Sequence, residues 1–317
     1  MKGALVMLGG AMFRRAERRH VMSALPPESP EPESRDLLGL RYPNTARVWN
    51  YHLLGKDNFE VDRRAAEAVN AKLLEIGVPS AADMAVETRH LLQRIVDYMA
   101  DQGVRQFLDL GSGLPNMAHT HEIAQRAAPG ARVVYVDIDP MVTSHASALM
   151  SGSDVVALQA DLREPEQILS NPEVRQLLDF AQPVGIIFMC TLHCLWDEED
   201  PWKVVRRFRD AVPPGSYLAL SHMTNETHQE AAQAVFQMTQ DLHWNTPLIS
   251  RSRADIDRFF DGFTLVEPGL VTPAQWRPDI HDPIRDSNDA PVLRLIVPEP
   301  ARHDRSTWNL CGVGIKN

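Results

Sequence analysis

Short apolar runs and amphipathic stretches alternate through the central part of the chain. The runs at 107–110, 132–137, 154–159 and 184–189 are almost continuously apolar and rich in Val, Leu and Ile. Such runs are typical of strands that are buried on both faces of a parallel sheet. The segments between them are long enough to hold helices that cross from one strand to the next. The pattern therefore predicts an open α/β sheet.

Helical periodicity frames this central region. Apolar residues recur at three- and four-residue intervals over 62–76, and Ser80 followed by Asp83 marks the start of a second helix that ends near residue 100. Two further helices are expected over 200–211 and 224–242. The final two strands are expected near 263–267 and 310–315, and 290–297 is an additional strand candidate.

The segment 106–115, QFLDLGSGLP, carries the strongest functional signal. An apolar strand holds Asp109 near its end, the turn from Gly111 to Gly113 follows, and a helix is expected to begin near Ala118. Glycine lets the backbone turn sharply and approach a ligand more closely than any Cβ would allow. A strand, an acid, a glycine turn and a helix in this order are typical of a nucleotide site at the carboxyl edge of a parallel sheet.

Polar residues also stand where the next three strands end. Asp137 ends the second strand, roughly 20 residues beyond the glycine turn, where a carboxylate can accept both hydroxyl protons of a ribose. Asp161 follows the third strand, and Cys190 and His193 follow the fourth. Because parallel strands bring their carboxyl ends to one edge, we expect these residues to line one ligand crevice.

Two cofactors compete for this crevice, NAD and S-adenosylmethionine. A dinucleotide motif would place its third glycine at position 116, but Asn116 stands there after Leu114 and Pro115. Asp109 would repel a pyrophosphate, whereas it suits a cationic sulfonium amino acid. The residues therefore favour S-adenosylmethionine over NAD, and a tight turn that binds no ligand is the third interpretation.

Eight segments of the chain share a pattern with a known family. They are ARVWNYHLLGKDNF (46–59), FLDLGSGLPN (107–116), ARVVYVDIDP (131–140), ADLREPEQIL (160–169), VPPGSYLALSH (212–222), FFDGFTLVEPGLV (259–271), WRPD (276–279) and CGVGIK (311–316). Together they resemble the actinobacterial S-adenosylmethionine-dependent methyltransferase family that was formerly catalogued as a domain of unknown function. Two positions depart from that family, since Asn50 replaces an acid and Leu54 replaces a glycine.

The resemblance implies a fold and a division of the chain. The fold is α/β, a Rossmann-like class I methyltransferase fold with a mostly parallel seven-stranded sheet, an antiparallel last strand and an N-terminal helical lid. Residues 1–40, whose later part is rich in Pro, Glu and Ser, are expected to be a disordered extension. Residues 41–104 then hold the lid motif and its helices, and 105–317 form the S-adenosylmethionine-binding core.

The resemblance also implies that the 46–59 motif closes over the cofactor. No metal ligand is expected, because the consecutive acids Asp197 to Asp200 stand before Pro201 and are typical of a helix start. The lid motif and the strand ends together give one set of predicted cofactor-binding residues. They are Tyr51, Lys56, Asn58, Asp109, Gly111, Ser112, Gly113, Asp137, Ile138, Asp161, Leu162, Cys190 and His193.

Methyl transfer from a sulfonium is an in-line displacement, so the protein mainly aligns the reactants and excludes water. A base is needed only where the acceptor must lose a proton. His193 is the first candidate for a catalytic base and His52 in the lid motif is the second, while His222, after a fifth strand, has a weaker claim. The competing interpretation of each is a buried histidine with a structural hydrogen bond.

Aromatic residues give the sequence's indication of the acceptor. Trp49, Tyr51, Trp196 and Trp244 stand near the proposed crevice and could form an apolar pocket. Aromatic faces also attract a cationic methyl group. The alternative is that these side chains pack in the core or on the surface.

Composition limits the classes of binding partner and the cellular compartment that we expect for this protein. The 317 residues carry a formal net charge of −10, which argues against binding to a phosphate backbone. The three cysteines have neither disulfide nor metal spacing and fit a reducing cytoplasm. The apolar run at 4–13 is too short to span a bilayer. We expect no nucleic-acid or membrane partner, and a homodimer is the assembly considered.

The sequence thus predicts a cytoplasmic S-adenosylmethionine-dependent methyltransferase that acts on a small specialised metabolite. An aromatic or indolic acceptor is favoured by the aromatic residues near the crevice. A non-catalytic regulatory protein that binds S-adenosylmethionine is the first alternative, and an NAD-dependent oxidoreductase is the second.

Overall fold

A computed structural model of the protein describes residues 40–114, 119–149, 154–278 and 308–317. The described residues group into one compact unit. The expected disordered extension, the helix start near Ala118 and the additional strand at 290–297 fall outside the described residues, so these expectations stay predictions.

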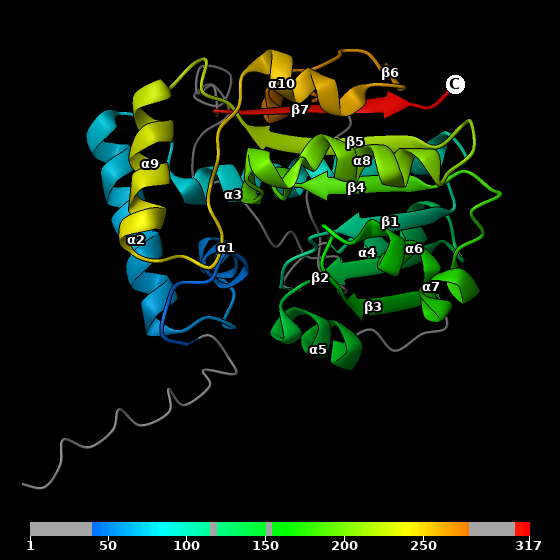
Figure 1. Ribbon diagram of the computed structural model, residues 1–317, viewed down its shortest axis with the longest axis horizontal. Helices are drawn as coiled ribbons and strands as arrows, with labels where there is room; N and C mark the ends of the chain where they lie inside the picture. The colour runs from blue at the N-terminus through cyan, green and yellow to red at the C-terminus, as the bar shows by residue number, and fades with distance from the viewer. Residues whose placement is uncertain (1–39, 115–118, 150–153, 279–307) are drawn as a thin grey trace, which may run out of the picture. The chain divides into compact units, whose positions relative to one another are not determined.

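Seven strands form a single sheet (Figure 1). They are β1 (Gln106–Leu110), β2 (Arg132–Asp137), β3 (Val155–Gln159), β4 (Gly185–Met189), β5 (Tyr217–Met223), β6 (Thr264–Leu265) and β7 (Asn309–Ile315). Their order is β3-β2-β1-β4-β5-β7-β6. The first five strands pair in parallel, whereas β7 runs antiparallel to both β5 and β6. The predicted mostly parallel seven-stranded sheet with an antiparallel last strand is confirmed.

The strand order reverses between β1 and β4. The chain runs outward from β1 through β2 to β3, and then returns to place β4 on the other side of β1. In an open α/β sheet the carboxyl ends of the strands at such a reversal leave a crevice that binds ligands. The glycine turn after β1 and the residues after β4 therefore meet where the topology favours a site.

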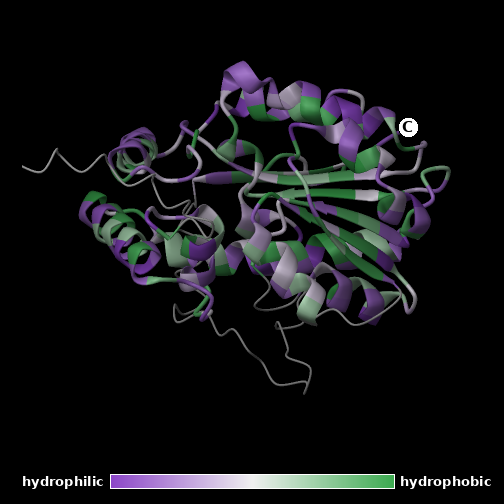
Figure 2. Ribbon diagram, turned by 60° about the horizontal axis from the view of Figure 1, so that its bottom comes forward, coloured by the Kyte–Doolittle hydropathy of each residue, from purple (hydrophilic) through white to green (hydrophobic). Residues whose placement is uncertain are grey.

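Helices cover both faces of the sheet. Alternate strand residues face opposite sides, so that Phe107 and Val133 pack with α3 and α4, while Leu108 and Val134 belong to the cluster that includes α8. Figure 2 shows the strands as largely hydrophobic between these layers. The helices are α1 (Thr45–His52), α2 (Glu60–Ile76), α3 (Ala81–Asp101), α4 (Thr120–Ala127), α5 (Pro140–Leu149), α6 (Pro165–Ser170), α7 (Pro172–Leu177), α8 (Pro201–Asp210), α9 (Gln229–Asp241) and α10 (Arg253–Asp257).

A third group of helices stands beyond the carboxyl ends of the parallel strands. Figure 1 shows α1, α2 and α9 there, on the left of the sheet. Val69 of α2 and Val235 of α9 pack in one buried cluster with Met223 at the end of β5 and with Trp308. This cluster holds the N-terminal helices over the sheet edge, in agreement with the expected helical lid.

Local signals for helix starts are confirmed. Ser80 caps α3 in a capping box with Asp83, and Asp200 caps α8 by accepting a hydrogen bond from the Lys203 amide. The helix expected at 224–242 was wrong at its start, because Thr224 continues the line of β5. Its amide donates to the Trp308 carbonyl at 2.8 Å, and α9 begins only at Gln229.

Candidate active site

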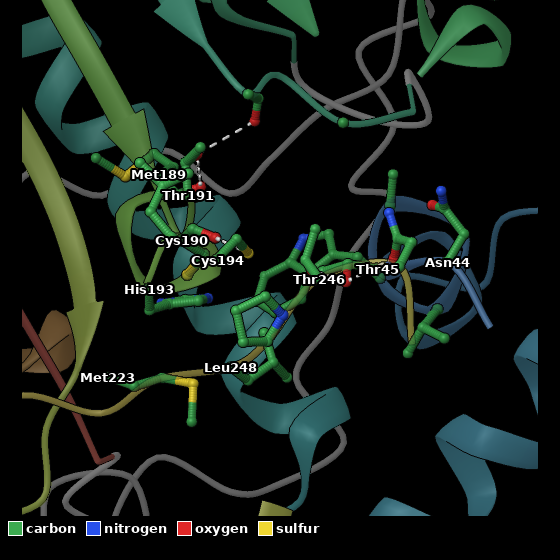
Figure 3. Close-up of a pocket in the computed structure, with 18 of the residues that line it drawn as sticks. Asn44, Thr45, Met189, Cys190, Thr191, His193, Cys194, Met223, Thr246 and Leu248 are labelled. Carbon is green, nitrogen blue, oxygen red and sulfur yellow. Dashed lines mark hydrogen bonds between the residues drawn. The ribbon is translucent and has the colours of Figure 1, made fainter. Parts of the chain in front are cut away.

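A cavity of about 510 Å³ lies at the carboxyl edge of the sheet. Its walls come from two groups of elements. The sheet-edge half consists of the residues at and after the ends of β1, β2, β3 and β4. The helical half consists of residues from 44–52, from α2, α3 and α9, from the end of β5 and from the segments near 245 and 308. Figure 3 shows Cys190, Thr191 and His193 on one side of this space and Asn44 and Thr45 of the lid on the other.

The glycine turn fixes the centre of the sheet-edge half. Gly111 and Gly113 have φ values of +75° and +67°, a backbone region that residues with a side chain rarely adopt. A Cβ on Gly111 would lie 2.3 Å from Cγ2 of Thr191, so this position also requires glycine for space. The Gly111 amide donates to the Val136 carbonyl at 2.7 Å, which ties the turn to β2.

Asp137 holds the turn from the neighbouring strand. One carboxylate oxygen accepts from the Gly113 amide at 2.9 Å and the other accepts from the Asp139 amide at 3.0 Å. Burial raises the pKa of Asp137, and these two amides oppose the shift. Each oxygen keeps a further lone pair, so the carboxylate can accept two more hydrogen bonds from a ligand in the cavity.

Asp109 lines the same part of the cavity. It is buried and accepts a hydrogen bond from the Thr120 hydroxyl at 2.6 Å. Burial raises its pKa to about 6, while Thr120 and the charge of Arg89 act in the opposite direction. The carboxylate therefore changes charge close to physiological pH.

The residues after β3 and β4 complete the sheet-edge half. Burial alone would raise the pKa of Asp161, but hydrogen bonds from Arg163 outweigh it and lower the pKa. Cys190 has a φ of +54°, and its amide donates to the carbonyl and hydroxyl oxygens of Ser221. This left-handed conformation is uncommon for a residue with a side chain, and such strain is concentrated at functional sites.

His193 and His52 both line the cavity, as the sequence predicted for a candidate base. His193 follows β4 in a short 3-10 turn, and His52 is the last residue of α1. Burial lowers the pKa of His193 to about 3, with the Arg251 charge adding to the shift, and burial lowers the pKa of His52 to about 4. Among the described residues, neither Nδ1 atom has a hydrogen-bond partner. Both imidazoles are neutral at physiological pH, and the Nδ1 atom of each is buried without a partner.

His222 does not share this position. It lies within β5 rather than after it, because the strand extends to Met223 through its pairing with β7. Its Nδ1 donates to the Met223 carbonyl, and its Nε2 accepts from Arg251, both at 2.7 Å. The structural interpretation of His222 is therefore the correct one, and the residue does not line the cavity.

Three predicted cofactor contacts lie away from the cavity wall. Tyr51 donates its hydroxyl to Glu67 at 2.9 Å, Lys56 is exposed, and Asn58 donates to Asn50 at 2.9 Å. A helix turns only one side towards a cavity, and in α1 that side carries Val48, Trp49 and His52. These three residues therefore lie outside the cavity wall, and their role as cofactor contacts stays a prediction. The other ten predicted cofactor contacts all line the cavity.

The helical half is mainly apolar. Of the four predicted aromatic residues, Trp49, Trp196 and Trp244 line the cavity and Tyr51 does not. Apart from Arg89, which lies beside the glycine turn, the described residues of this half carry no charged side chain. Its apolar members are Ala46, Val48, Trp49, Val69, Ala81, Met84, Leu92, Met223, Val235, Trp244, Pro247, Leu248 and Trp308.

The start of α1 is tied to both sides of the cavity. The Asn44 side chain caps α1 by accepting from the Arg47 amide, and it donates to the Asp139 carboxylate at 2.8 Å. Thr45 donates its amide to Asn245 at 2.8 Å, and its hydroxyl lies 2.7 Å from that of Thr246. These contacts were not foreseen from the sequence, because they join segments that are distant along the chain.

Arg89 is the main residue that the sequence analysis missed. It lines the cavity from the middle of α3 and is 8% exposed. Its neighbours on the buried face of the helix, Ala85 and Leu92, are apolar. A charged residue within the apolar face of a predicted helix was the signal that could have identified it.

Two structural absences apply to the described part of the chain. No helix there is both long and apolar enough to cross a membrane. In the same residues, no group of three acidic, histidine or cysteine side chains is placed to hold a metal ion.

Comparison with known proteins agrees with this geometry. Residues 32–317 match the model of a family described as S-adenosyl methyltransferase. A crystal structure of a candidate methyltransferase from Thermobifida fusca is similar with 38% identity and a TM-score of 0.75, over 91% of this chain and 100% of that one. A DUF574 family protein from Streptomyces avermitilis is similar with 31% identity and a TM-score of 0.74, over 88% and 100%. A search of curated proteins gave no significant match.

Proposed function

Since the chain belongs to the S-adenosyl methyltransferase family, and is thus an S-adenosylmethionine-dependent methyltransferase, we propose that it methylates a small uncharged acceptor, with aromatic or indolic compounds favoured. The observation that carries this proposal is the helical half of the cavity. Its walls are apolar and aromatic, and its one charged side chain, Arg89, lies at the glycine turn. Burying a charged acceptor against such walls without a partner would be costly.

The residues of the sheet-edge half fit S-adenosylmethionine. Gly113 has no protein atom within 4 Å of where a Cβ would stand, and Asp137 has free lone pairs for the two ribose hydroxyls. Asp109, when ionised, suits the ammonium group of the methionyl part. When bound there, the cofactor supplies an electrophilic methyl group on a cationic sulfur.

The protein's own contribution is alignment, exclusion of water and acceptance of a proton. The apolar walls and the lid exclude water from the space between the two halves. His193 stands directly after β4 with a neutral imidazole, and we assign it the role of accepting the acceptor's proton where the acceptor must lose one. His52 faces the same cavity from the lid and is the second choice for this role.

The proposal extends to the cellular setting. Three free cysteines and a net charge of −10 favour a cytoplasmic enzyme without a nucleic-acid partner. A homodimer is the assembly that we propose to test by light scattering, where a mass equal to that of a single chain would exclude it.

An acceptor screen with methyl-labelled S-adenosylmethionine tests the acceptor class. Phenols and indoles would be compared with matched analogues that carry one carboxylate or one ammonium group. We expect label in the uncharged members and S-adenosylhomocysteine formation in the same reactions. Preferential methylation of the charged members would refute the proposed acceptor class, and absence of turnover with any member would leave only the family assignment standing.

A further inference from the structure

Arg89 differs from the other buried arginines of the described residues. Arg47 pairs with Asp62 at 2.8 Å, Arg94 with Glu87 at 3.1 Å and Arg251 with Asp197 at 2.7 Å. Arg89 has no such partner, because its guanidinium makes no ion pair with any described residue. Its Nε is also buried without a hydrogen bond, as is the Nε of the paired Arg94. An isolated charge in the interior is costly, so an unpaired buried guanidinium requires an explanation.

The surroundings of Arg89 place it beside the glycine turn. It lines the main cavity and also a small hollow that it shares with Asp109, Ser112, Gly113 and Tyr135. Asp109 is close enough for its charge to act on Arg89, yet the two groups do not form an ion pair, and Asp109 is already bonded to Thr120. A cation and an acid thus face the same space without neutralising each other.

We propose that Arg89 binds the α-carboxylate of the methionyl part of S-adenosylmethionine, with Asp109 facing its ammonium group. This proposal rests on the assignment of the cavity to that cofactor. A guanidinium is suited to a carboxylate because its planar fork can donate two parallel hydrogen bonds. The separated pair of charges matches the two opposite charges of an amino acid. The other described residues of the helical half are uncharged, so the proposed uncharged acceptor has no need of Arg89.

The proposal has a consequence for the empty protein. If Arg89 is kept for a ligand, its charge is unfavourable until the ligand arrives, as is usual for groups held ready at functional sites. Arg89→Met should therefore raise the melting temperature of the ligand-free protein while weakening cofactor binding. A residue that only supports the fold would lower the melting temperature when it is replaced.

The test compares two ligands by calorimetry. S-adenosylhomocysteine carries the α-carboxylate, and its decarboxylated analogue keeps the amine but lacks the carboxylate. The wild-type protein should bind S-adenosylhomocysteine about 10- to 100-fold more tightly than the analogue, as expected for charge-assisted hydrogen bonds. Arg89→Met should remove this preference by weakening S-adenosylhomocysteine alone, and Arg89→Lys should restore part of it.

Arg94→Met provides the matched control. Arg94 lies on the same helix and is equally buried, but it is paired with Glu87 and does not line the cavity. Its replacement should lower stability and leave the ratio of the two affinities unchanged.

Several results would overturn the proposal. They are a wild-type protein that does not distinguish the two ligands, equal weakening of both ligands by Arg89→Met, or a loss confined to the Michaelis constant of the methyl acceptor. The last result would assign the carboxylate to the acceptor. Failure of the wild-type protein to bind either ligand would instead refute the cofactor site itself.

Discussion

The two halves of the cavity are built on different principles. In the sheet-edge half, backbone amides and carboxylates bond to one another, as Gly113 and Asp137 do across β1 and β2. In the helical half, side chains such as Val69, Met84 and Trp244 meet through apolar contact, and the Nδ1 atom of His52 is left without a partner. Directed bonds hold one ligand in one orientation, whereas apolar walls accept any molecule of suitable shape. The first half therefore suits an invariant cofactor and the second suits an acceptor.

Replacing His193 should produce the largest effect, because it removes the proposed base without touching the sheet-edge bonds. We expect His193→Ala to lower turnover about 100-fold or more while the dissociation constant of S-adenosylhomocysteine stays nearly unchanged. Single-turnover kinetics and calorimetry on the same variant measure both quantities. Weaker binding with normal turnover would show that His193 belongs to the cofactor wall, and no change in either would move the search to His52.

Replacing Asp137 should weaken cofactor binding, whereas replacing His193 should lower turnover. Asp137→Ala removes two charge-assisted hydrogen bonds to the ribose, each worth about 1.5–3 kcal/mol before relaxation. Relaxation recovers part of this loss, so with 1.4 kcal/mol per decade the affinity for S-adenosylhomocysteine should fall at least about 10-fold. Asp161→Ala should cost less, because that carboxylate is already committed to Arg163. An unchanged dissociation constant for Asp137→Ala would place the ribose elsewhere.

Acid should weaken the sheet-edge half alone. The pKa of Asp109 is raised to about 6, so the carboxylate is charged above that pH and becomes neutral as the pH falls through it. Because only the charged form attracts an ammonium group, affinity for S-adenosylhomocysteine should fall by up to about 10-fold between pH 7 and pH 5. His193 and His52 do not titrate in this range, since their pKa values are about 3 and about 4. Asp109→Asn should bind more weakly at pH 7 and show a flat profile, and a steep profile in that variant would exclude Asp109 as its source.

The smallest effect is expected in the apolar wall. Trp244→Leu removes aromatic contact worth about 0.5–1.5 kcal/mol, which corresponds to a rise of roughly 3- to 10-fold in the Michaelis constant of the acceptor. Cofactor affinity should not change. Tyr51→Phe is the matched control, because Tyr51 contacts Glu67 instead of the cavity. Equal effects of both variants would argue against an acceptor site at Trp244.

The same contrast explains what the sequence could predict. The glycine turn, Asp137 and the residues after β4 lie in or next to short strands. There the apolar pattern of the sequence predicts both the strand and the residues that reach the carboxyl edge of the sheet. Arg89 has no motif around it, and Trp244 and Trp308 reach the cavity only through packing among segments that are far apart in the chain. Part of the lid motif lines the cavity, but membership of a motif does not say which side of α1 a residue occupies, as Tyr51 shows.

Asn44 links the fraying of α1 to the opening of a contact across the cavity. Its side chain caps the N-terminus of α1 by accepting a hydrogen bond from the Arg47 amide. The same side chain donates to the Asp139 carboxylate on the opposite edge of the cavity. Fraying of the first turn of an eight-residue helix would break both bonds together. We therefore expect ligand exchange to depend on a local helix–coil transition, an event that on its own takes about a microsecond or less.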